Sequence, residues 1–583
     1  MEQKLQEAIA LHRQGSLANA ERVYIQILQQ DPNHVDALHL LGMVALQTRR
    51  PERGIRLIEK VIRLNPNIAS AHNNRGIMLR DLERFDEAVA SYDRAIALEP
   101  DSAASHNNRG VALKALARLD EALASHDKAI ALAPDYAEAH SNRGIALRDL
   151  KRFGEAVASC DRAIALRPDY AEAHNNRGIA LRDLKRLEEA LAGCDRAIAL
   201  RPGYAEAHNN RGIALRELKR PEEALASYDR AIALKPDYAE AYSNRCIALQ
   251  DLRRCDEAIA SCDKAIALNP RNTGAYYNKS MACLATGDLP TGWKLYEYRK
   301  PVWDVSRYRP YRQPLWLGEG DPAGKTVFLT WEQGFGDTIQ FCRYARLVQA
   351  LGARVVLSVQ EPLVRLLRQL EPRIQIVGPD QEPGTFDLHC PLMSLPLAFG
   401  TTLETIPSAQ PYLVSDPRLQ ARWAARLPPG TRPRIGLAWS GYVHHPNDHS
   451  RSVALSQLRP LLSLDVDWVC LQKEFRPAEA ASLASCPRLT LLGDELEDFA
   501  DTASVIDQLD LVIAVDTSVA HLAGALGKSV WILLSFSPDW RWLLYGEESP
   551  WYPTARLYRQ PRIDDWPAVI EEVKSELASR FLG

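Results

Sequence analysis

The sequence lacks the features that would point to a membrane or to a nucleic acid. No run approaches the roughly 18 consecutive apolar residues that cross a bilayer. The N-terminal stretch "MEQKLQEAIALHRQGSLANAE" alternates charged and apolar residues and has no signal-peptide core, so we expect a cytoplasmic location. The formal net charge is −3 over 583 residues, which gives no electrostatic support for binding a nucleic acid.

The ten cysteines lack the CxxC spacing of metal sites and redox centres. Cys160, Cys194 and Cys262 share one position of a 34-residue repeat, and that position holds tyrosine or histidine in other repeats. A position that accepts these medium-sized residues is typical of packing between helices. We therefore expect neither a disulfide nor a metal site among the cysteines.

The repeat itself dominates the N-terminal half of the chain. A typical unit, "YAEAHNNRGIALRDLKRLEEALAGCDRAIALRPG", predicts two helices, the first ending near "DLKR" and the second ending at the proline. Small residues in both helices permit a close approach. The same glycine recurs every 34 residues, at Gly42, Gly76, Gly110, Gly144, Gly178 and Gly212.

The period and the small residues resemble the tetratricopeptide repeat. The resemblance implies eight full repeats through residue 272 and a ninth, partial one to about residue 299. Stacked helix pairs of this kind form an α-helical solenoid with a long concave groove, which suits extended partners.

One asparagine recurs in the first helix of seven successive repeats. An amide both donates and accepts hydrogen bonds, so a row of asparagines can hold an extended chain without reading its side chains. Alternatively, the asparagines are solvated or bond within the solenoid. The same position lines the superhelix of O-linked N-acetylglucosamine transferases, which this half resembles, and this resemblance implies a groove for a protein or peptide acceptor. The asparagines are Asn74, Asn108, Asn142, Asn176, Asn210, Asn244 and Asn278.

A histidine recurs two residues before these asparagines in most units. It fills the aromatic packing position of the repeat, so we expect it to be structural. The residues are His72, His106, His140, His174 and His208.

The 34-residue period ends near residue 299, and a Pro-, Tyr-, Arg- and Trp-rich linker follows at 300–323. Beyond it, short apolar strands alternate with helices, which predicts parallel sheets covered on both faces. A Pro-rich break divides this region into 324–427 and 428–583. We expect two Rossmann-like halves, with ligands at the carboxyl ends of the strands.

Four motifs stand at those predicted strand ends. Hydroxyl groups and backbone amides at a helix N-terminus bind a diphosphate without a metal, and a nearby arginine adds a fixed positive charge. The motif residues are Gly334, Gly336 and Asp337 in "GFGD", then Ser440, Gly441 and Arg451, then Gln472, and finally Asp516, Thr517, Ser518 and His521 in "DTSVAHLAGAL".

In this order the motifs resemble those of the ADP-heptose heptosyltransferase family, which has the two-domain B-type glycosyltransferase fold. The resemblance covers roughly residues 324–560. It implies that Asp337 is the catalytic base, that Thr517, Ser518 and His521 contact the diphosphate of a nucleotide sugar, and that Arg451 stands in for the family's lysine. The first α/β half then faces the acceptor and the second half binds the donor.

The resemblance thus implies a metal-independent glycosyltransferase that needs no cofactor besides its nucleotide-sugar substrate, and it favours inversion of configuration at the transferred sugar. Two alternatives stay open. Asp337 is also placed to cap the helix that follows it, a role that does not exclude chemistry. Separately, the chain could be a repeat scaffold whose transferase-like half is inactive and only binds a nucleotide or a partner. An NAD-dependent oxidoreductase is excluded, because the glycine loop lacks the third glycine of GxGxxG and the next strand, in "VVLSVQ", ends in glutamine where an acid is needed.

Two further clusters invite a ligand interpretation. His444, His445 and His449 lack an accompanying acidic DxD motif, so we discount a metal. The segment 540–542, Trp-Arg-Trp, is placed either to stack on a sugar or nucleobase or to pack at a domain edge.

Overall fold

The computed structural model describes residues 1–302, 311–408, 411–427, 430, 432–443, 447–476, 479–484 and 486–582. These residues form two compact units, Met1–Lys235 and Pro236–Gly583. We describe each unit by itself. The sequence-based boundaries at 299, 323 and 427 stay predictions.

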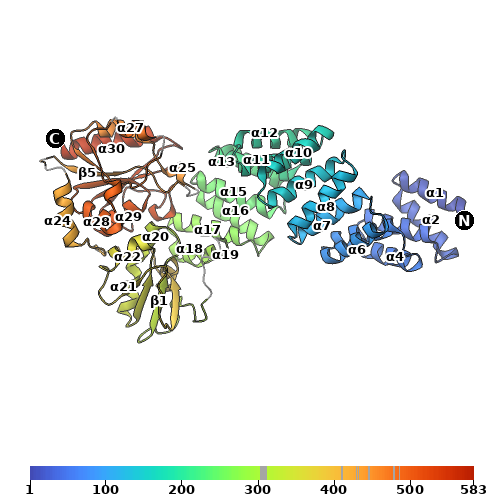
Figure 1. Ribbon diagram of the computed structural model, residues 1–583, viewed down its shortest axis with the longest axis horizontal. Coiled ribbons are helices and arrows are strands. Elements are labelled where there is room, and N and C mark those ends of the chain that lie inside the picture. The colour runs from blue at the N-terminus through green and yellow to red at the C-terminus, as the bar shows by residue number, and fades with distance from the viewer. Residues whose placement is uncertain are drawn as a thin grey trace. The chain divides into compact units, whose positions relative to one another are not determined.

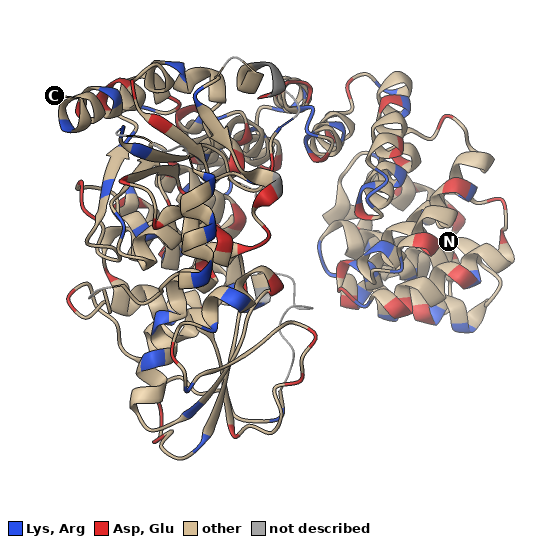
Figure 2. Ribbon diagram, turned by 60° about the vertical axis from the view of Figure 1, so that its left-hand side comes forward, with Lys and Arg blue, Asp and Glu red and all other residues tan. Residues whose placement is uncertain are grey.

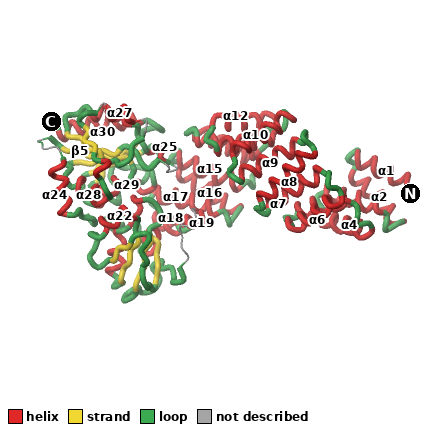
Figure 3. The backbone as a smooth tube through the Cα atoms, viewed as in Figure 1, coloured by secondary structure: helices red, strands yellow, loops and turns green. Residues whose placement is uncertain are grey.

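The first unit is helical throughout its ordered elements, as Figures 1 and 3 show. Each repeat contributes two helices, and the second ends just before the recurring proline. The helices are α1 Glu2–Arg13, α2 Leu17–Gln30, α3 Val35–Gln47, α4 Pro51–Leu64, α5 Ala69–Asp81, α6 Phe85–Leu98, α7 Ala103–Ala115, α8 Leu119–Leu132, α9 Ala137–Asp149, α10 Phe153–Leu166, α11 Ala171–Asp183, α12 Leu187–Leu200, α13 Ala205–Glu217 and α14 Pro221–Leu234.

The recurring glycine lets the two helices of a repeat touch. A Cβ atom added at Gly76 would lie 2.5 Å from the Tyr92 ring, and one at Gly144 would lie 2.6 Å from the Cys160 sulfur. No side chain fits there without displacing its neighbour. The helical solenoid predicted from the period is confirmed.

One repeat breaks this glycine rule, and the expectation of no disulfide is wrong there. Cys246 occupies the glycine position and Cys262 the facing position, with their Cα atoms 5.7 Å apart, and the two sulfurs form a disulfide. The physical reason lies in the repeat geometry, because two positions in contact in every unit are both cysteine in this one. The other eight cysteines are free thiols.

The second unit begins with further helix pairs of the repeat kind. These helices are α15 Ala239–Asp251, α16 Cys255–Leu268, α17 Thr273–Thr286, α18 Leu289–Tyr296 and α19 Arg299–Val302. They share a core with the region that follows, since the Trp293 indole of α18 donates to the Thr401 carbonyl over 3.0 Å and lies edge-on to Trp540, 5.2 Å between ring centres. Shared burial explains why these repeats belong to the second unit.

Two parallel sheets follow, as the strand pattern predicts. The first has the order β3-β2-β1-β4, with Val327 of β1 paired to Val355 of β2 and to Leu388 of β4. Its strands are β1 Thr326–Thr330, β2 Arg354–Ser358, β3 Gln375–Val377 and β4 Leu388–Pro391. The helices that accompany it are α20 Phe335–Phe341, α21 Arg343–Ala350, α22 Glu361–Leu367 and α23 Leu395–Ala398.

The second sheet has the order β10-β9-β8-β5-β6-β7, again all parallel. Figure 1 shows helices on both of its sides. Its strands are β5 Arg434–Ala438, β6 Asp467–Cys470, β7 Leu489–Leu491, β8 Leu511–Val515, β9 Val530–Leu534 and β10 Ala555–Arg559. Its helices are α24 Pro417–Arg426, α25 Asp448–Arg451, α26 Arg459–Leu462, α27 Ala480–Ala484, α28 Phe499–Ile506, α29 Ser518–Ala525 and α30 Trp566–Phe581.

Strand β10 was not predicted. Arg556 and Arg559 stand among its apolar residues. It lies at the edge of the described sheet, where β9 pairs with it on one side and an isolated bridge joins Arg556 to Glu548 on the other. An edge strand needs no continuous apolar run, so the pattern used for the buried strands missed it.

Charges of both signs are interspersed over the helices, as Figure 2 shows. None of the helices in the described residues is both long enough and apolar enough to cross a bilayer.

Candidate functional site

Asp337 caps a helix and also carries an ion pair. It stands in the first turn of α20, where its Oδ2 accepts a hydrogen bond from the Gly334 N–H over 2.8 Å. Its Oδ1 pairs with the guanidinium of Arg541, which lies in the short 3-10 turn η6 Trp540–Trp542. Helix capping and a place in a charged site therefore coexist in one side chain.

The environment of Asp337 works in two directions on its ionisation. Burial raises the pKa of the carboxyl group above its ordinary value of 3.8, while Arg541 and the Gly334 N–H lower it; burial wins. The side chain is still 19% exposed, so a proton donor can reach it. A carboxylate with a raised pKa is a better proton acceptor than an exposed one.

Arg541 is held from several sides. Its Nη1 lies 2.8 Å from Asp539 Oδ1, its Nε donates to Gln340 Oε1 over 2.7 Å, and its guanidinium lies 4.3 Å from the Trp540 ring centre. Burial disfavours the charge, but Asp539 and Asp337 outweigh it and the pKa of Arg541 is raised. The arginine is therefore a fixed positive charge beside Asp337.

The two tryptophans around Arg541 are packed inside. Trp540 is 2% exposed and Trp542 is fully buried, stacked on the His521 ring at 5.2 Å. Of the two sequence interpretations, packing at a domain edge is therefore the one that the structure shows.

The "GFGD" and "DTSVAH" motifs meet. A Cβ added at Gly336 would lie 2.9 Å from His521 Cδ2 and 3.6 Å from Ser518 Cα, so glycine is needed for this contact between α20 and α29. His521 Nδ1 lies 2.9 Å from the Tyr552 hydroxyl. Burial first, then the charge of Arg541, lowers the pKa of His521 well below its ordinary value, so the ring is neutral and acts through hydrogen bonds.

Asp516 directly follows β8 and adds a second carboxyl group with a raised pKa. Burial, then the nearby Asp539, raises its pKa to about 6, against the opposing charges of Arg451 and Arg541. Its Oδ1 lies 3.9 Å from His521 Nε2. Carboxyl groups with shifted pKa values beside a fixed cation are typical of functional sites.

The second and third motifs support this group from the β5 side. The Arg451 guanidinium lies over Gly441, where an added Cβ would come within 2.5 Å of Nη2, and its Nη1 donates to the Asp516 carbonyl over 3.2 Å. Gln472 Oε1 accepts from the Ser440 N–H over 2.8 Å, and its Nε2 donates to Ser440 Oγ over 3.0 Å. Gln472 thus fixes the loop that follows β5, and Arg451 ties that loop to the fourth motif.

Several side chains in this region hold a buried polar atom that has no hydrogen-bond partner among the described residues. They include Gln333 Nε2, Gln340 Nε2, Arg451 Nε and Thr517 Oγ1. Buried polar atoms are almost always paired, so a group of unpaired ones beside a helix N-terminus is typical of a site that receives a polar ligand.

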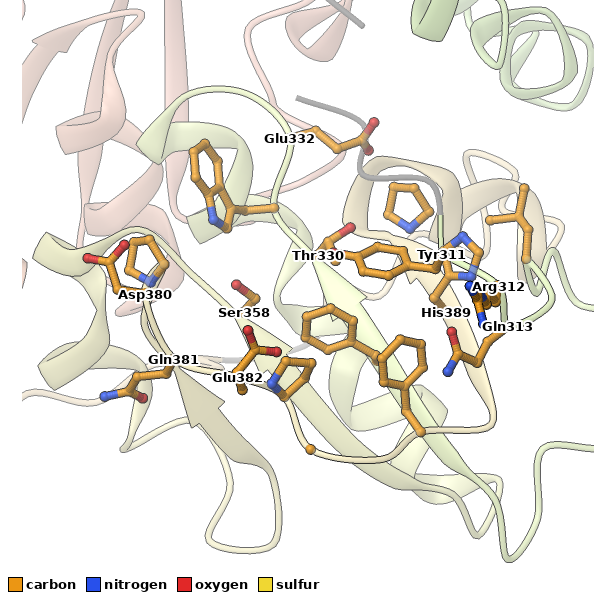
Figure 4. A pocket seen from close by; sticks show the side chains of 18 of the residues that line it. Tyr311, Arg312, Gln313, Thr330, Glu332, Ser358, Asp380, Gln381, Glu382 and His389 are labelled. Carbon is orange, nitrogen blue, oxygen red and sulfur yellow. The ribbon is translucent and has the colours of Figure 1, made fainter. Parts of the chain in front are cut away.

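A cavity of about 740 Å³ lies on the first sheet next to this site. Its lining includes Thr330 and Ser358 at the ends of β1 and β2, and Glu332 in the loop that leads to Asp337. Figure 4 shows Asp380 and Gln381 on the opposite side of the cavity from Tyr311 and His389. The cavity thus opens where the sequence predicts the acceptor side.

The recurring asparagines bond from one repeat to the next. Asn142 Nδ2 donates to Asn107 Oδ1 over 3.1 Å, and Asn210 Nδ2 donates to Asn175 Oδ1 over 2.9 Å. The same link joins Asn108 to Asn73, Asn176 to Ser141 and Asn278 to Ser243, while Asn74 Nδ2 lies 2.8 Å from His39 Nε2. All seven are partly exposed, Asn244 included. The links favour bonding within the solenoid for the amide nitrogens and leave the acceptor role as a prediction.

The recurring histidines brace the turn before their own helix. Each ring Nε2 lies within hydrogen-bond distance of the carbonyl of the proline six residues earlier, from 2.9 Å at His72 to 3.2 Å at His208. The structural role predicted for them is confirmed. In the discounted metal cluster, His444 and His445 lie outside the described residues, and His449 is exposed on α25.

Comparison with known proteins identifies the helical part. Seven segments match the family described as tetratricopeptide repeat: residues 5–67, 39–103, 73–137, 107–171, 142–205, 205–238 and 246–296. Residues 5–296 consist of tetratricopeptide repeats.

One curated relative aligns with about half of this chain. Protein FlbA of Caulobacter vibrioides (strain ATCC 19089 / CIP 103742 / CB 15) is 27% identical over 321 residues, which cover 50% of this chain and 53% of FlbA. The chain thus spans about half the length of this curated relative.

Among solved structures, YrrB, described as a TPR protein with an unusual peptide-binding site, is 26% identical, with 32% of this chain and 95% of YrrB covered and a TM-score of 0.26. MamA is 24% identical, with 28% and 96% covered and a TM-score of 0.27. A tetratricopeptide repeat protein from Parabacteroides merdae ATCC 43184 is 16% identical, with 42% and 98% covered and a TM-score of 0.38.

The sequence did not predict that Arg541 pairs with Asp337, nor that Gln340 and Asp539 hold Arg541. Arg541 stood in a segment singled out for its aromatic residues, and Gln340 and Asp539 carried no signal. The short helix α19, which follows the repeats, also contributes, because Arg299 forms a buried ion pair with Glu332 at 2.8 Å, in the loop before Asp337. The sequence signal available for this contact was the position of Arg299, directly after the last repeat.

Proposed function

We propose that the chain is a metal-independent glycosyltransferase of the B-type fold, with two Rossmann-like halves, that moves a sugar from a nucleotide diphosphate to a protein or peptide in the cytoplasm. The observation that carries this proposal is the contact of Gly336, next to Asp337, with the α29 N-terminus, where Thr517 Oγ1 is buried and has no hydrogen-bond partner among the described residues. Glycosyl transfer needs a proton acceptor and a cradle for the leaving diphosphate, and this place offers both.

The donor would bind at the second sheet. Thr517 and Ser518 present a hydroxyl group each at the start of α29, where the helix N-terminus favours a phosphate. Arg451 supplies positive charge to the diphosphate, with Gly441 leaving room for its guanidinium. The neutral His521 donates or accepts a hydrogen bond without adding charge.

Asp337 would then accept the proton of the acceptor hydroxyl or amide as that atom attacks the anomeric carbon. The bond from this carbon to the donor phosphate breaks in the same displacement, and the diphosphate leaves with the electron pair. One base and one displacement invert the configuration of that carbon.

The decisive experiment incubates the purified chain with a panel of nucleotide sugars, measuring donor hydrolysis and the mass of candidate protein acceptors. We expect one donor to be consumed, and Asp337→Ala to slow its transfer by roughly 10²–10⁴-fold. The matched control is Asp565→Ala, because the Asp565 carboxylate also accepts a backbone N–H at the start of a helix, α30, away from the candidate site. If no donor is bound or consumed, the proposal is wrong.

The acceptor would lie along the row of asparagines. Replacing Asn142, Asn176 and Asn210 by alanine should raise the acceptor's KM and leave donor hydrolysis unchanged. The matched control replaces their bonding partners, Asn107, Ser141 and Asn175, because it removes the same three links but keeps the row. Equal effects of the two triple variants would mean that the row is only structural.

A second candidate function is a repeat scaffold that binds a nucleotide without turning it over. The observation that favours it is that both carboxylate oxygens of Asp337 already have partners, Gly334 and Arg541. Calorimetry with nucleotide diphosphates separates the two functions, since the scaffold binds the nucleotide but consumes no donor sugar.

A further inference from the structure

Arg541 reaches Asp337 from the other half of the α/β region. Asp337 lies in α20, beside the first sheet, and Arg541 lies in η6, between β9 and β10 of the second. The two are 204 residues apart in the sequence and form an ion pair. Their contact therefore depends on the two halves being folded together.

The guanidinium has little freedom to leave. Its three nitrogens are each engaged, with Asp337, Asp539 and Gln340 as the acceptors. Trp540 covers one face of it, and Trp540 itself packs on Trp293 from the last repeat. A planar group held at three points also fixes the orientation of the carboxylate it contacts.

A buried carboxyl group near Asp539 favours its neutral form, and a neutral acid accepts no proton. Burial does raise the pKa of Asp337, and Arg541 is the strongest influence that opposes it. The other charged or titratable groups that act on or near Asp337 are Asp539, Glu332 and Tyr296, and the two carboxylates among them oppose its ionisation. The neutral His521 lies behind Gly336.

We propose that Arg541 is a positioning residue that keeps the Asp337 carboxylate ionised and aimed, so that its remaining lone pairs can accept the acceptor's proton. This inference rests on the proposed transferase function. Arg541 acts through Asp337 and the substrate need not touch it.

The test is the pH dependence of transfer by the full chain, measured with the nucleotide sugar that the wild type consumes in the panel experiment described above. For Arg541→Ala we expect turnover at pH 7 to fall about a hundredfold or more, with the loss shrinking as the pH rises, because alkali restores the ionised Asp337. Added guanidinium ion should restore part of the activity at pH 7. Arg541→Lys keeps the charge, so its acid limb should stay near that of the wild type while its maximal rate falls.

The matched control is Arg343→Ala. Arg343 is as buried as Arg541, but it donates to the Trp551 carbonyl and the Tyr412 hydroxyl and does not contact Asp337. The Arg343→Ala variant should be less stable than the wild type, but the acid limb of its pH–rate profile should stay where it is in the wild type. Should Arg541→Ala not fold, Arg541→Gln fills most of the space without the charge and is measured in the same way.

The outcomes separate the two ideas. A wild-type chain that consumes no donor overturns the transferase function and this inference together. A wild-type chain that is active, with variants at Arg541 whose acid limb is unchanged and which guanidinium does not restore, overturns this inference alone.

Discussion

The ion pair that recurs in the repeats differs in its burial from the ion pair that holds the loop before Asp337. In the repeats, Arg109 pairs with Asp93 sixteen residues earlier, and these side chains are 23% and 51% exposed. The same pair recurs at Arg143, Arg177 and Arg211. The pair that ties α19 to the α/β region is different, since the Arg299 and Glu332 side chains are only 0% and 3% exposed. Repeated charges line a solvated edge, whereas a single buried charge fixes one particular loop.

The largest expected effect tests this contrast directly. Arg299→Met leaves Glu332 buried without its partner and should lower the free energy of unfolding of the second unit by about 3–5 kcal/mol. Arg109→Met should cost about 0–1 kcal/mol. Denaturant unfolding of both variants measures the difference. The double variant Arg299→Met/Glu332→Leu should recover part of the lost stability. Equal losses for Arg299→Met and Arg109→Met would contradict the claim that the buried ion pair matters more than the exposed one.

The next effect concerns the one repeat that departs from the others. The Cys246–Cys262 bond closes a loop of 16 residues, so reduction should lower the stability of the wild type by about 3 kcal/mol. Cys246→Gly restores the residue of the other repeats and should be insensitive to reductant. Thiol labelling in denaturant checks the bond itself, with eight reactive thiols before reduction and ten after it. Ten thiols before reduction would contradict it.

A slightly smaller effect follows from Asp516. Its pKa is about 6 in the folded chain, above the ordinary 3.8, so the folded chain binds more protons between these values. Raising the pH from about 4 to about 6 should therefore lower the free energy of unfolding, by about 2–3 kcal/mol. Asp516→Asn should lose this dependence and be more stable than the wild type at pH 8, with little difference at pH 4. Thermal melting at several pH values tests it, and parallel pH curves for the two chains would refute it.

The smallest effect lies in the repeats. His174→Phe keeps the ring but loses the hydrogen bond to the Pro168 carbonyl, and should cost about 1 kcal/mol. The matched variant His106→Phe has the same bond, to Pro100, and should cost the same. Different losses at these two positions would show that the repeats are not equivalent.

The repeats were predictable in detail because each position is written many times. The prolines and glycines gave the helix ends and the close contacts, and the histidine role followed from its recurrence. The exception, Cys246, was a visible break in the glycine series, but its meaning required knowing that the glycine faces Cys262.

The sequence predicted only those residues of the candidate site that stand directly after a strand. Asp337 and the start of α29 stand at strand ends, so the alternation of strands and helices located them. Arg541 owes its place to packing between two sheets, and no local pattern links it to a residue 204 positions away. Strand β10 was also not predictable from a local pattern. Its arginines are tolerated because it lies at the edge of the sheet, and its place there depends on the other strands.

The packing of the Trp293 indole limits how a chain of this kind can gain or lose repeats in evolution. The indole contacts Thr401 and Trp540 of the α/β region. Losing or gaining a helix at the C-terminal end of the repeats would therefore break these contacts. Duplication of a 34-residue unit upstream of Lys235 disturbs only its immediate neighbours. Natural variants of this architecture should therefore differ in repeat number at the N-terminal end and keep the final helix pair.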